Sequence, residues 1–157
     1  MKTSITAVAV MAALAIAGCG GSDKKKSDSG SNGALSYSQF GQKANAICKA
    51  ANDKVNPLSS KFTGQAANDA PLYDTVIPTI KDGVAQFKKL QPPAELKASY
   101  DEFIAVSDQQ ITADEAAQTA AKSGDDAAYQ QALSALKPLS AKSNAAASKL
   151  GAAECAK

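Results

Sequence analysis

Apolar residues recur at spacings of three and four along most of the chain from Ser36 onward, which is the period of one face of an α-helix. No segment there alternates apolar and polar residues in the manner of a strand. The pattern divides into four amphipathic stretches that are joined mostly by short connections. The sequence therefore predicts an all-α protein, an antiparallel four-helix bundle that occupies residues 36–157.

Prolines bound the first two predicted helices, because proline removes a backbone hydrogen bond and clashes with the preceding turn. We expect the first helix to start at Ser36 and end at Pro57, and the second to begin at Pro71, a favoured first-turn residue, and stop at Pro92. Their inner faces carry Phe40, Ala44, Ile47, Cys48, Ala51 and Val55 in the first helix and Leu72, Val76, Ile80, Val84, Phe87 and Leu90 in the second.

The third and fourth helices have clearer end signals. The third begins at Pro93 and is broken by Ser123 and Gly124, and Asp125 is suited to cap the start of the fourth. Gly151 suits the left-handed position that closes the fourth helix. Their inner faces carry Leu96, Tyr100, Phe103, Ser107 and Ile111 in the third helix and Tyr129, Leu133, Leu136, Leu139, Ala147 and Leu150 in the fourth.

The two ends of the predicted bundle differ in the size of their inward side chains. Aromatic and leucine side chains gather at one end, whereas alanine lines the other end together with Tyr129 and Leu133. The helical wheel also turns Asp114 and Gln118 inward there, so Asp114, Gln118 and Tyr129 form a candidate pocket. The alternative is that the alanines let the helices approach closely and leave no room for a ligand.

Two prolines, Pro78 and Pro138, fall inside the second and fourth predicted helices. Each is expected to bend its helix, because it breaks the regular hydrogen bonding. Such bends either wrap the helices around the core or open a cavity between them.

The start of the chain carries an export signal. Residues 5–18 are uncharged and follow Lys2; the run is shorter than the roughly 20 residues that span a bilayer and is typical of a signal peptide. Residues 16–19, IAGC, resemble the lipobox of bacterial lipoproteins. This resemblance implies that residues 1–18 are removed and that Cys19 receives a diacylglycerol. The alternative is an ordinary secretory signal with a chance cysteine.

Residues 20–34 contain no large apolar side chain, so they cannot bury enough surface to offset the entropy of ordering them. We expect residues 19–35 to be the lipidated N-terminus and a flexible, disordered linker with a span of about 20–25 Å. Lys24 to Lys26 either touch anionic lipid head groups or are simply solvated. The expected location is extracytoplasmic, with the two acyl chains on Cys19 anchoring the protein to the cell membrane.

Composition argues against several classes of function. All 17 basic residues are lysine and 15 residues are acidic, so the chain lacks arginine for bidentate phosphate or base recognition and is not expected to bind nucleic acid. It also has no histidine, which removes the usual catalytic triads and histidine-based metal or haem sites. We expect neither an enzyme nor a cofactor or metal. Three carboxylates at intervals of seven, Asp101, Asp108 and Glu115, are expected to be solvated.

Three cysteines are present, and lipidation of Cys19 would leave Cys48 and Cys155. Outside the cytoplasm an even remainder is normally paired, so we predict a disulfide between them. The chain after Gly151 would then turn back along the bundle and cover the groove between the first and fourth helices. Two free thiols are the alternative.

These features together resemble small exported helical lipoproteins of actinobacteria, which are generally of uncharacterised function. The resemblance rests on the lipobox, the spacing of Phe40, Ala44 and Cys48, the QPPAEL junction at 91–96 and the LGAAEC end at 150–155. Two functions fit the sequence. The first is an interaction or structural module that meets an unknown protein partner in the cell envelope. The second is a small-molecule or lipid binding module with a cavity between its helices.

Overall fold

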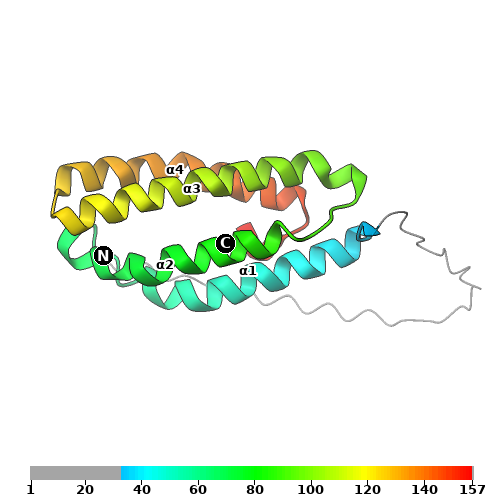
Figure 1. Cartoon of the computed structure of the whole chain (residues 1–157), viewed down its shortest axis with the longest axis horizontal. Helices are drawn as coiled ribbons and strands as arrows, with labels where there is room; N and C mark the ends of the chain where they lie inside the picture. The colour runs from blue at the N-terminus through cyan, green and yellow to red at the C-terminus, as the bar shows by residue number, and fades with distance from the viewer. Residues whose placement is uncertain (1–32, 157) are drawn as a thin grey trace, which may run out of the picture.

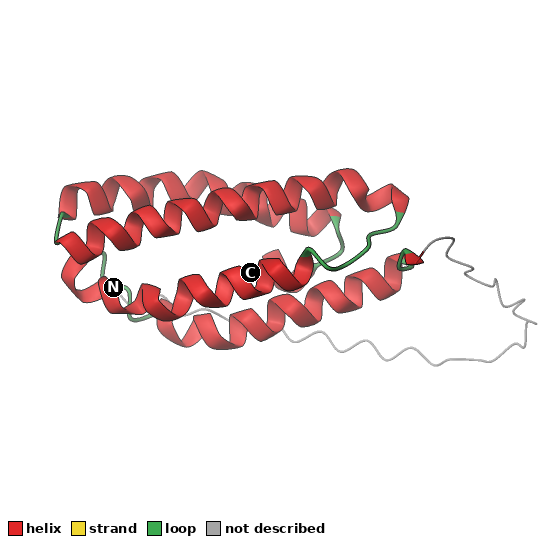
Figure 2. Cartoon of the chain, viewed as in Figure 1, coloured by secondary structure: helices red, strands yellow, loops and turns green. Residues whose placement is uncertain are grey.

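The computed structural model describes residues 33–156, and the regular structure of this part of the chain is entirely helical (Figure 2). The predicted signal peptide at 1–18, Cys19 and most of the predicted linker lie outside the described residues. The elements in order are α1 (Tyr37–Ser59), α2 (Ala66–Phe87), the 3-10 helix η2 (Ala94–Leu96), α3 (Lys97–Ser123), α4 (Asp126–Lys149) and the 3-10 helix η3 (Ala153–Ala156). The predicted all-α four-helix bundle is confirmed.

The four long helices pack in chain order. α2 lies against both α1 and α3, and α3 lies against α4, as Figure 1 shows. The C-terminal segment η3 contacts both α1 and α4. It therefore links the first and last helices of the bundle.

The start of α2 differs from the prediction, because the helix begins at Ala66 rather than at Pro71. The backbone N–H of Ala66 donates to the Asp126 carboxylate at the start of α4, over 3.0 Å. A carboxylate at a helix N-terminus satisfies a free N–H and interacts favourably with the helix dipole. Residues from another helix therefore stabilise a first turn that the local sequence does not mark.

The C-terminal ends of α1 and α2 also differ from the prediction. Pro57 lies inside α1, which continues to Ser59; a proline two residues from the end of a helix removes only one bond of the last turn. α2 ends at Phe87, before the predicted Pro92. The Phe87 carbonyl accepts from the N–H of Leu90 and from the Tyr100 hydroxyl, so the chain tightens there instead of continuing the helix.

The C-terminal end of α3 and both ends of α4 agree with the prediction, whereas α3 begins at Lys97, after the 3-10 turn η2, and not at the predicted Pro93. Gly124 follows α3 in the left-handed conformation with φ 72°, which favours glycine because a Cβ is strained there. The Asp125 side chain accepts from the Ala128 N–H over 2.9 Å and caps α4. Gly151, with φ 67°, lies just beyond α4. At the start of the bundle, Ser36 and Gln39 form a reciprocal capping box for α1.

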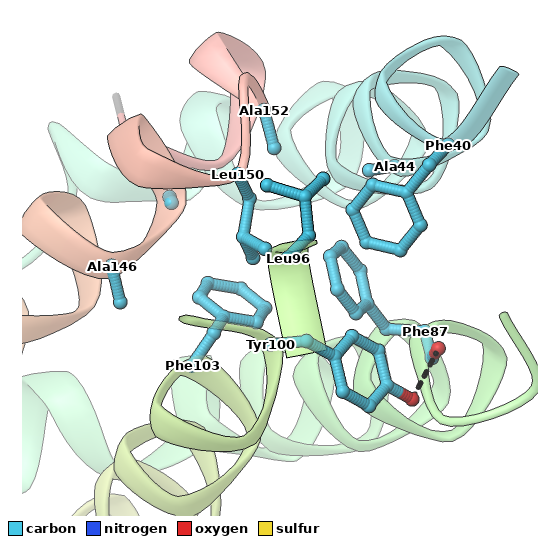
Figure 3. Close-up of a cluster of buried hydrophobic side chains, with 10 residues drawn as sticks. Phe40, Ala44, Phe87, Leu96, Tyr100, Phe103, Ala146, Leu150 and Ala152 are labelled. Atoms are coloured by element: carbon cyan, nitrogen blue, oxygen red, sulfur yellow. Dashed lines mark hydrogen bonds between the residues drawn. The ribbon is translucent and has the colours of Figure 1, made fainter. Parts of the chain in front are cut away.

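The predicted firm end of the core is a cluster of aromatic side chains, which we call the aromatic cluster (Figure 3). The rings of Phe87 and Phe103 lie 4.7 Å apart between centroids, and Phe40 meets Phe87 edge to face at 5.9 Å. The Tyr100 hydroxyl donates to the Phe87 carbonyl over 3.1 Å. The buried members of the cluster are Phe40, Ala44, Phe87, Leu96, Tyr100, Phe103, Ala146, Ala147, Leu150 and Ala152.

The other end of the bundle is built from small side chains around two tyrosines. Its buried members, here called the alanine cluster, are Ala66, Tyr73, Ile77, Ala117, Ala120, Ala121 and Tyr129. Alanines on α3 let α4 approach closely, as the pattern of the sequence predicts.

Ion pairs join α2 and α3 along the outside of the bundle. Asp108 pairs with Lys88 over 2.8 Å, and Glu115 pairs with Lys81. All four side chains are about half exposed, so each pair contributes little free energy. The predicted stripe of carboxylates is thus solvated but also paired with lysine.

Candidate functional site

A cavity of about 280 Å³ lies beside the aromatic cluster, with which it shares Phe87 and Phe103. All four long helices and η3 contribute to its lining. None of the described residues that line it is charged. They are Ile47, Cys48, Ala51, Asn52, Val55, Ile80, Gly83, Val84, Phe87, Phe103, Ser107, Gln110, Ser140, Ser143, Asn144 and Cys155.

The apolar wall of the cavity comes mainly from α1 and α2. The sequence places Ile47, Cys48, Ala51 and Val55 on the inner face of α1, and all four line the cavity. They are only half-buried, whereas Phe40 and Ala44 earlier in the same stripe are fully buried. The second half of the α1 stripe therefore faces the cavity instead of packing into a core.

The opposite wall comes from α3 and α4 and is polar but uncharged. The Ser107 hydroxyl donates to the Phe103 carbonyl over 2.8 Å, and the Gln110 amide donates to the Ser140 hydroxyl over 3.3 Å. Ser143 is 7% exposed, and its hydroxyl has no hydrogen-bond partner among residues 33–156. No enclosed side-chain oxygen or nitrogen of the described residues lacks a partner, so this hydroxyl reaches accessible space and is able to bond to a molecule in the cavity.

Several residues that line the cavity are small. A Cβ placed on Gly83 would lie 3.8 Å from the Cβ of Ala51, which is ordinary van der Waals contact, so α1 and α2 approach each other closely at this edge of the cavity. Ser107 and Ser143 are the corresponding small residues on the polar wall. Protein interiors are normally packed to crystal-like density, which makes this unfilled volume informative. Pro78 and Pro138 lie on α2 and α4, within the two helices that flank the space.

A disulfide closes one side of the cavity. Cys48 and Cys155 are bonded, with their Cα atoms 5.0 Å apart, and both line the cavity. The backbone N–H of Glu154 donates to Asn45 over 2.8 Å, and the Asn52 amide donates to the Glu154 carbonyl over 2.7 Å. The predicted pairing is confirmed, as is the return of the tail along the bundle. The tail forms the 3-10 turn η3, and these bonds hold it against α1.

The three residues of the predicted pocket do not line this cavity. The Gln118 amide reaches the surface and donates to Asp74 over 2.8 Å. Asp114 is half-buried and has no hydrogen bond or ion pair with the described residues; burial raises its pKa to about 6. Tyr129 is fully buried, and burial together with hydrogen bonds to Tyr73 and Asp69 raises the pKa of its hydroxyl.

Tyr129 belongs to a buried polar network centred on Asp69, which sequence reasoning missed. Asp69 is fully buried and accepts from the Tyr129 hydroxyl, the Thr63 N–H and the Gly64 N–H, each over 2.8 Å, and from the Thr63 hydroxyl over 3.0 Å. Burial opposes the charge, but these four hydrogen bonds outweigh it and lower the pKa of Asp69. The network ties the loop before α2 to α4. It is saturated by its own partners and has a structural role.

Sequence reasoning also missed Gly83, Ser143 and Asn144 as cavity residues. A usable signal exists for Ser143, which lies four residues after Leu139 and four before Ala147 and so falls on the predicted inner face of α4. Asn144 and Gly83 have no such signal. Their position at the cavity depends on how far the helices lie apart.

Other features of the described residues are less specific. A second hollow lies between α1 and α2 and is ringed by Lys43, Asp82 and Lys89, whose charges keep it hydrated. Residues 33–156 contain no group of three or more cysteine, aspartate or glutamate side chains placed to hold a metal ion. None of the described helices combines the length and the apolar character needed to cross a bilayer.

Comparison with known proteins gives no assignment. No protein-family model, no curated protein and no solved structure matches this chain. The function is therefore argued from the chemistry of the cavity and from the signals at the start of the sequence.

Proposed function

We propose that this protein is an extracytoplasmic lipoprotein, anchored to the membrane through Cys19, that binds a small molecule in the cavity between its helices. The observation that carries the proposal is an uncharged cavity of about 280 Å³ lined by all four helices. Small-molecule sites are concave and mostly apolar, with a few placed polar groups. Residues 47–155 supply both kinds of lining.

The size of the cavity supports a small ligand. Its volume lies near the lower limit of typical ligand pockets, which is about 300 Å³. An engineered cavity of about 150 Å³ is sufficient for benzene. The space thus suits a molecule somewhat larger than a single aromatic ring, and not a whole lipid.

The described surface gives less support to an interaction module. Among residues 33–156, Tyr37 is the only large hydrophobic side chain that is exposed, at 50%. Protein interfaces usually have an apolar centre with aromatic anchors. One tyrosine at the start of α1 does not make such a centre, so ligand binding is the better-supported of the two functions.

Titration with indole tests the proposal. Indole is neutral and compact, and its binding to the isotope-labelled chain can be followed by the NMR shifts of the Gly83 and Ser143 amides. A ligand of this size is expected to bind with a dissociation constant of about 1 mM or tighter. We expect the shifts to saturate at one indole per chain.

Filling the cavity should abolish this binding. Ser143→Leu fills it from α4 and Ala51→Leu fills it from α1, so the two variants test the same space from opposite walls. Ser134→Leu is the matched control, since Ser134 is exposed on α4 and its hydroxyl bonds only the Gln130 carbonyl. Absence of saturable shifts in the parent chain, or unchanged binding in both filled variants, would contradict the proposal.

A further inference from the structure

We infer that the cavity takes a neutral molecule of about twelve non-hydrogen atoms that is apolar at one end and has one hydroxyl or amide group at the other. This inference rests on the proposed function and names the chemical class of its ligand. The size of the ligand follows from the volume of the cavity in this protein, which is about twice that of an engineered cavity that holds the six carbons of benzene.

The lining makes the ligand neutral. None of the described lining residues is a lysine, an aspartate or a glutamate. A charged group that leaves water for an uncharged site loses its hydration and gains no ion pair. Carboxylate, phosphate and ammonium ligands are therefore disfavoured in this cavity.

The two walls orient the ligand. Ile47, Val55, Ile80 and Val84 form apolar surface on α1 and α2, and Phe87 adds a ring from the aromatic cluster. These side chains can offer only apolar contact to a ligand. The hydrocarbon end of the molecule is therefore placed against α1 and α2.

The hydrogen-bonding end is placed against α4. Ser143 as a whole is 7% exposed, but its hydroxyl oxygen is accessible and has no hydrogen-bond partner among the described residues, so it can both donate and accept. Ser140 and Asn144 on either side of it are exposed and mark the mouth of the cavity. A hydroxyl or amide fits this position, because either group can donate to or accept from Ser143 without carrying charge.

Three compounds of nearly the same shape test the charge requirement. Para-ethylbenzamide is neutral and polar, para-ethylbenzoate is its carboxylate counterpart, and para-ethylcumene replaces the polar group with an isopropyl group. Calorimetric titration of the purified chain at pH 8 should show that the amide binds at least about 30-fold more tightly than the carboxylate. Equal affinity for the two would overturn the inference while leaving the proposed function intact. Failure of all three compounds to bind would overturn both.

Ser143→Ala tests the orientation. Loss of one hydrogen bond should weaken the affinity for para-ethylbenzamide by about three- to tenfold. The affinity for para-ethylcumene should stay within about twofold, since this compound cannot bond to the hydroxyl. Ser134→Ala, on the exposed side of the same helix, should change neither affinity. A Ser143→Ala variant with an unchanged circular dichroism spectrum that weakens both compounds equally, or neither, would show that Ser143 does not receive the polar end.

Discussion

Two aspartates of this protein are withdrawn from water in the folded state, and their pKa values move in opposite directions. Asp69 is fully buried but accepts four hydrogen bonds, and its pKa is lowered. Asp114 is only half-buried but has no partner among the described residues, and burial raises its pKa to about 6. The difference shows that hydrogen bonding, more than depth, decides the direction in which the pKa of a carboxylate moves in this bundle.

Asp69→Asn should destabilise the fold. The neutral amide has one acceptor oxygen where the carboxylate has two, so it leaves a backbone N–H of Thr63 or Gly64, or the Tyr129 hydroxyl, without an acceptor. We expect the free energy of unfolding at pH 7 to fall by about 2–4 kcal/mol in urea titrations. The control Asp53→Asn, whose carboxylate is 62% exposed beside Lys49, should change it by less than about 0.5 kcal/mol. Equal effects of the two substitutions would contradict the network's structural role.

The same substitution should alter the acid limb of the stability profile. Because the folded pKa of Asp69 is lowered, its contribution is fully present above the ordinary value of 3.8 and is lost as pH falls through the folded value below it. The parent chain should therefore lose stability below about pH 4 more steeply than Asp69→Asn. Parallel urea titrations of the two chains across that range provide the comparison.

Asp114→Asn should stabilise the protein at neutral pH. Because the folded pKa is raised from 3.8 to about 6, the parent binds more protons when folded, and its stability falls as pH rises between these values. One unit of pKa corresponds to about 1.4 kcal/mol. Above pH 6, Asp114→Asn should therefore raise the free energy of unfolding by up to about 3 kcal/mol. Chemical unfolding at pH 4 and pH 7 measures it, with Glu115→Gln as a solvent-exposed control. A variant that keeps the parent's loss of stability between the two pH values would refute this assignment.

At the scale of elements, the C-terminal turn η3 joins the two helices that are farthest apart in the sequence. Its contacts with α1 and α4 are reinforced by the bonds of Asn45 and Asn52 to Glu154 and by the disulfide. The loop that the disulfide closes spans 107 residues. Closing such a long loop restricts the conformations of the unfolded chain strongly and so stabilises the folded state.

Reduction of the disulfide should therefore destabilise the bundle by up to about 4–5 kcal/mol. A chain with Cys19→Ser is suitable, since its only thiols then come from Cys48 and Cys155. Without reductant it should show no reactive thiol after denaturation and run as a monomer on a non-reducing gel. Adding Cys48→Ser and Cys155→Ser should give the melting temperature of the reduced chain. Two reactive thiols per chain before reduction would show that the pair does not form.

At the scale of the whole molecule, the proposed lipid anchor and the cavity are independent parts. The cavity is lined by residues between Ile47 and Cys155. The predicted anchor is Cys19, and the predicted linker at 19–35 separates the two. A tether of about 20–25 Å would keep the binding site close to the membrane surface without constraining its orientation.

Cys19→Ser should move the protein from the membrane fraction to the soluble fraction, because it removes the proposed attachment point for a diacylglycerol. Metabolic labelling with a fatty-acid probe should be lost at the same time. Indole binding should be unchanged, since the described residues that line the cavity fall between Ile47 and Cys155. Labelling that persists in the variant would sink the lipoprotein assignment and leave the cavity proposal standing.

The sequence by itself determined the features that depend on neighbouring residues. The helical period, the breaks at Gly124 and Gly151, the cap at Asp125 and most of the aromatic cluster follow from local conformational preference and from the inward face of each helix, whereas Tyr73 and Ile77 of the alanine cluster were not on the predicted face. The disulfide followed from cysteine parity and antiparallel geometry. These rules need no knowledge of the distance between helices.

Only the tertiary structure decided where contacts between distant segments fall. α2 begins at Ala66 because Asp126 caps it, and Tyr129 from α4 adds one of the four hydrogen bonds to Asp69; both partners are 60 residues away. The cavity beside the aromatic cluster was likewise not predicted, and the candidate pocket at Asp114, Gln118 and Tyr129 stays a prediction. Periodicity shows which side chains point inward, but whether they fill the space depends on the summed volumes of four helices at one level.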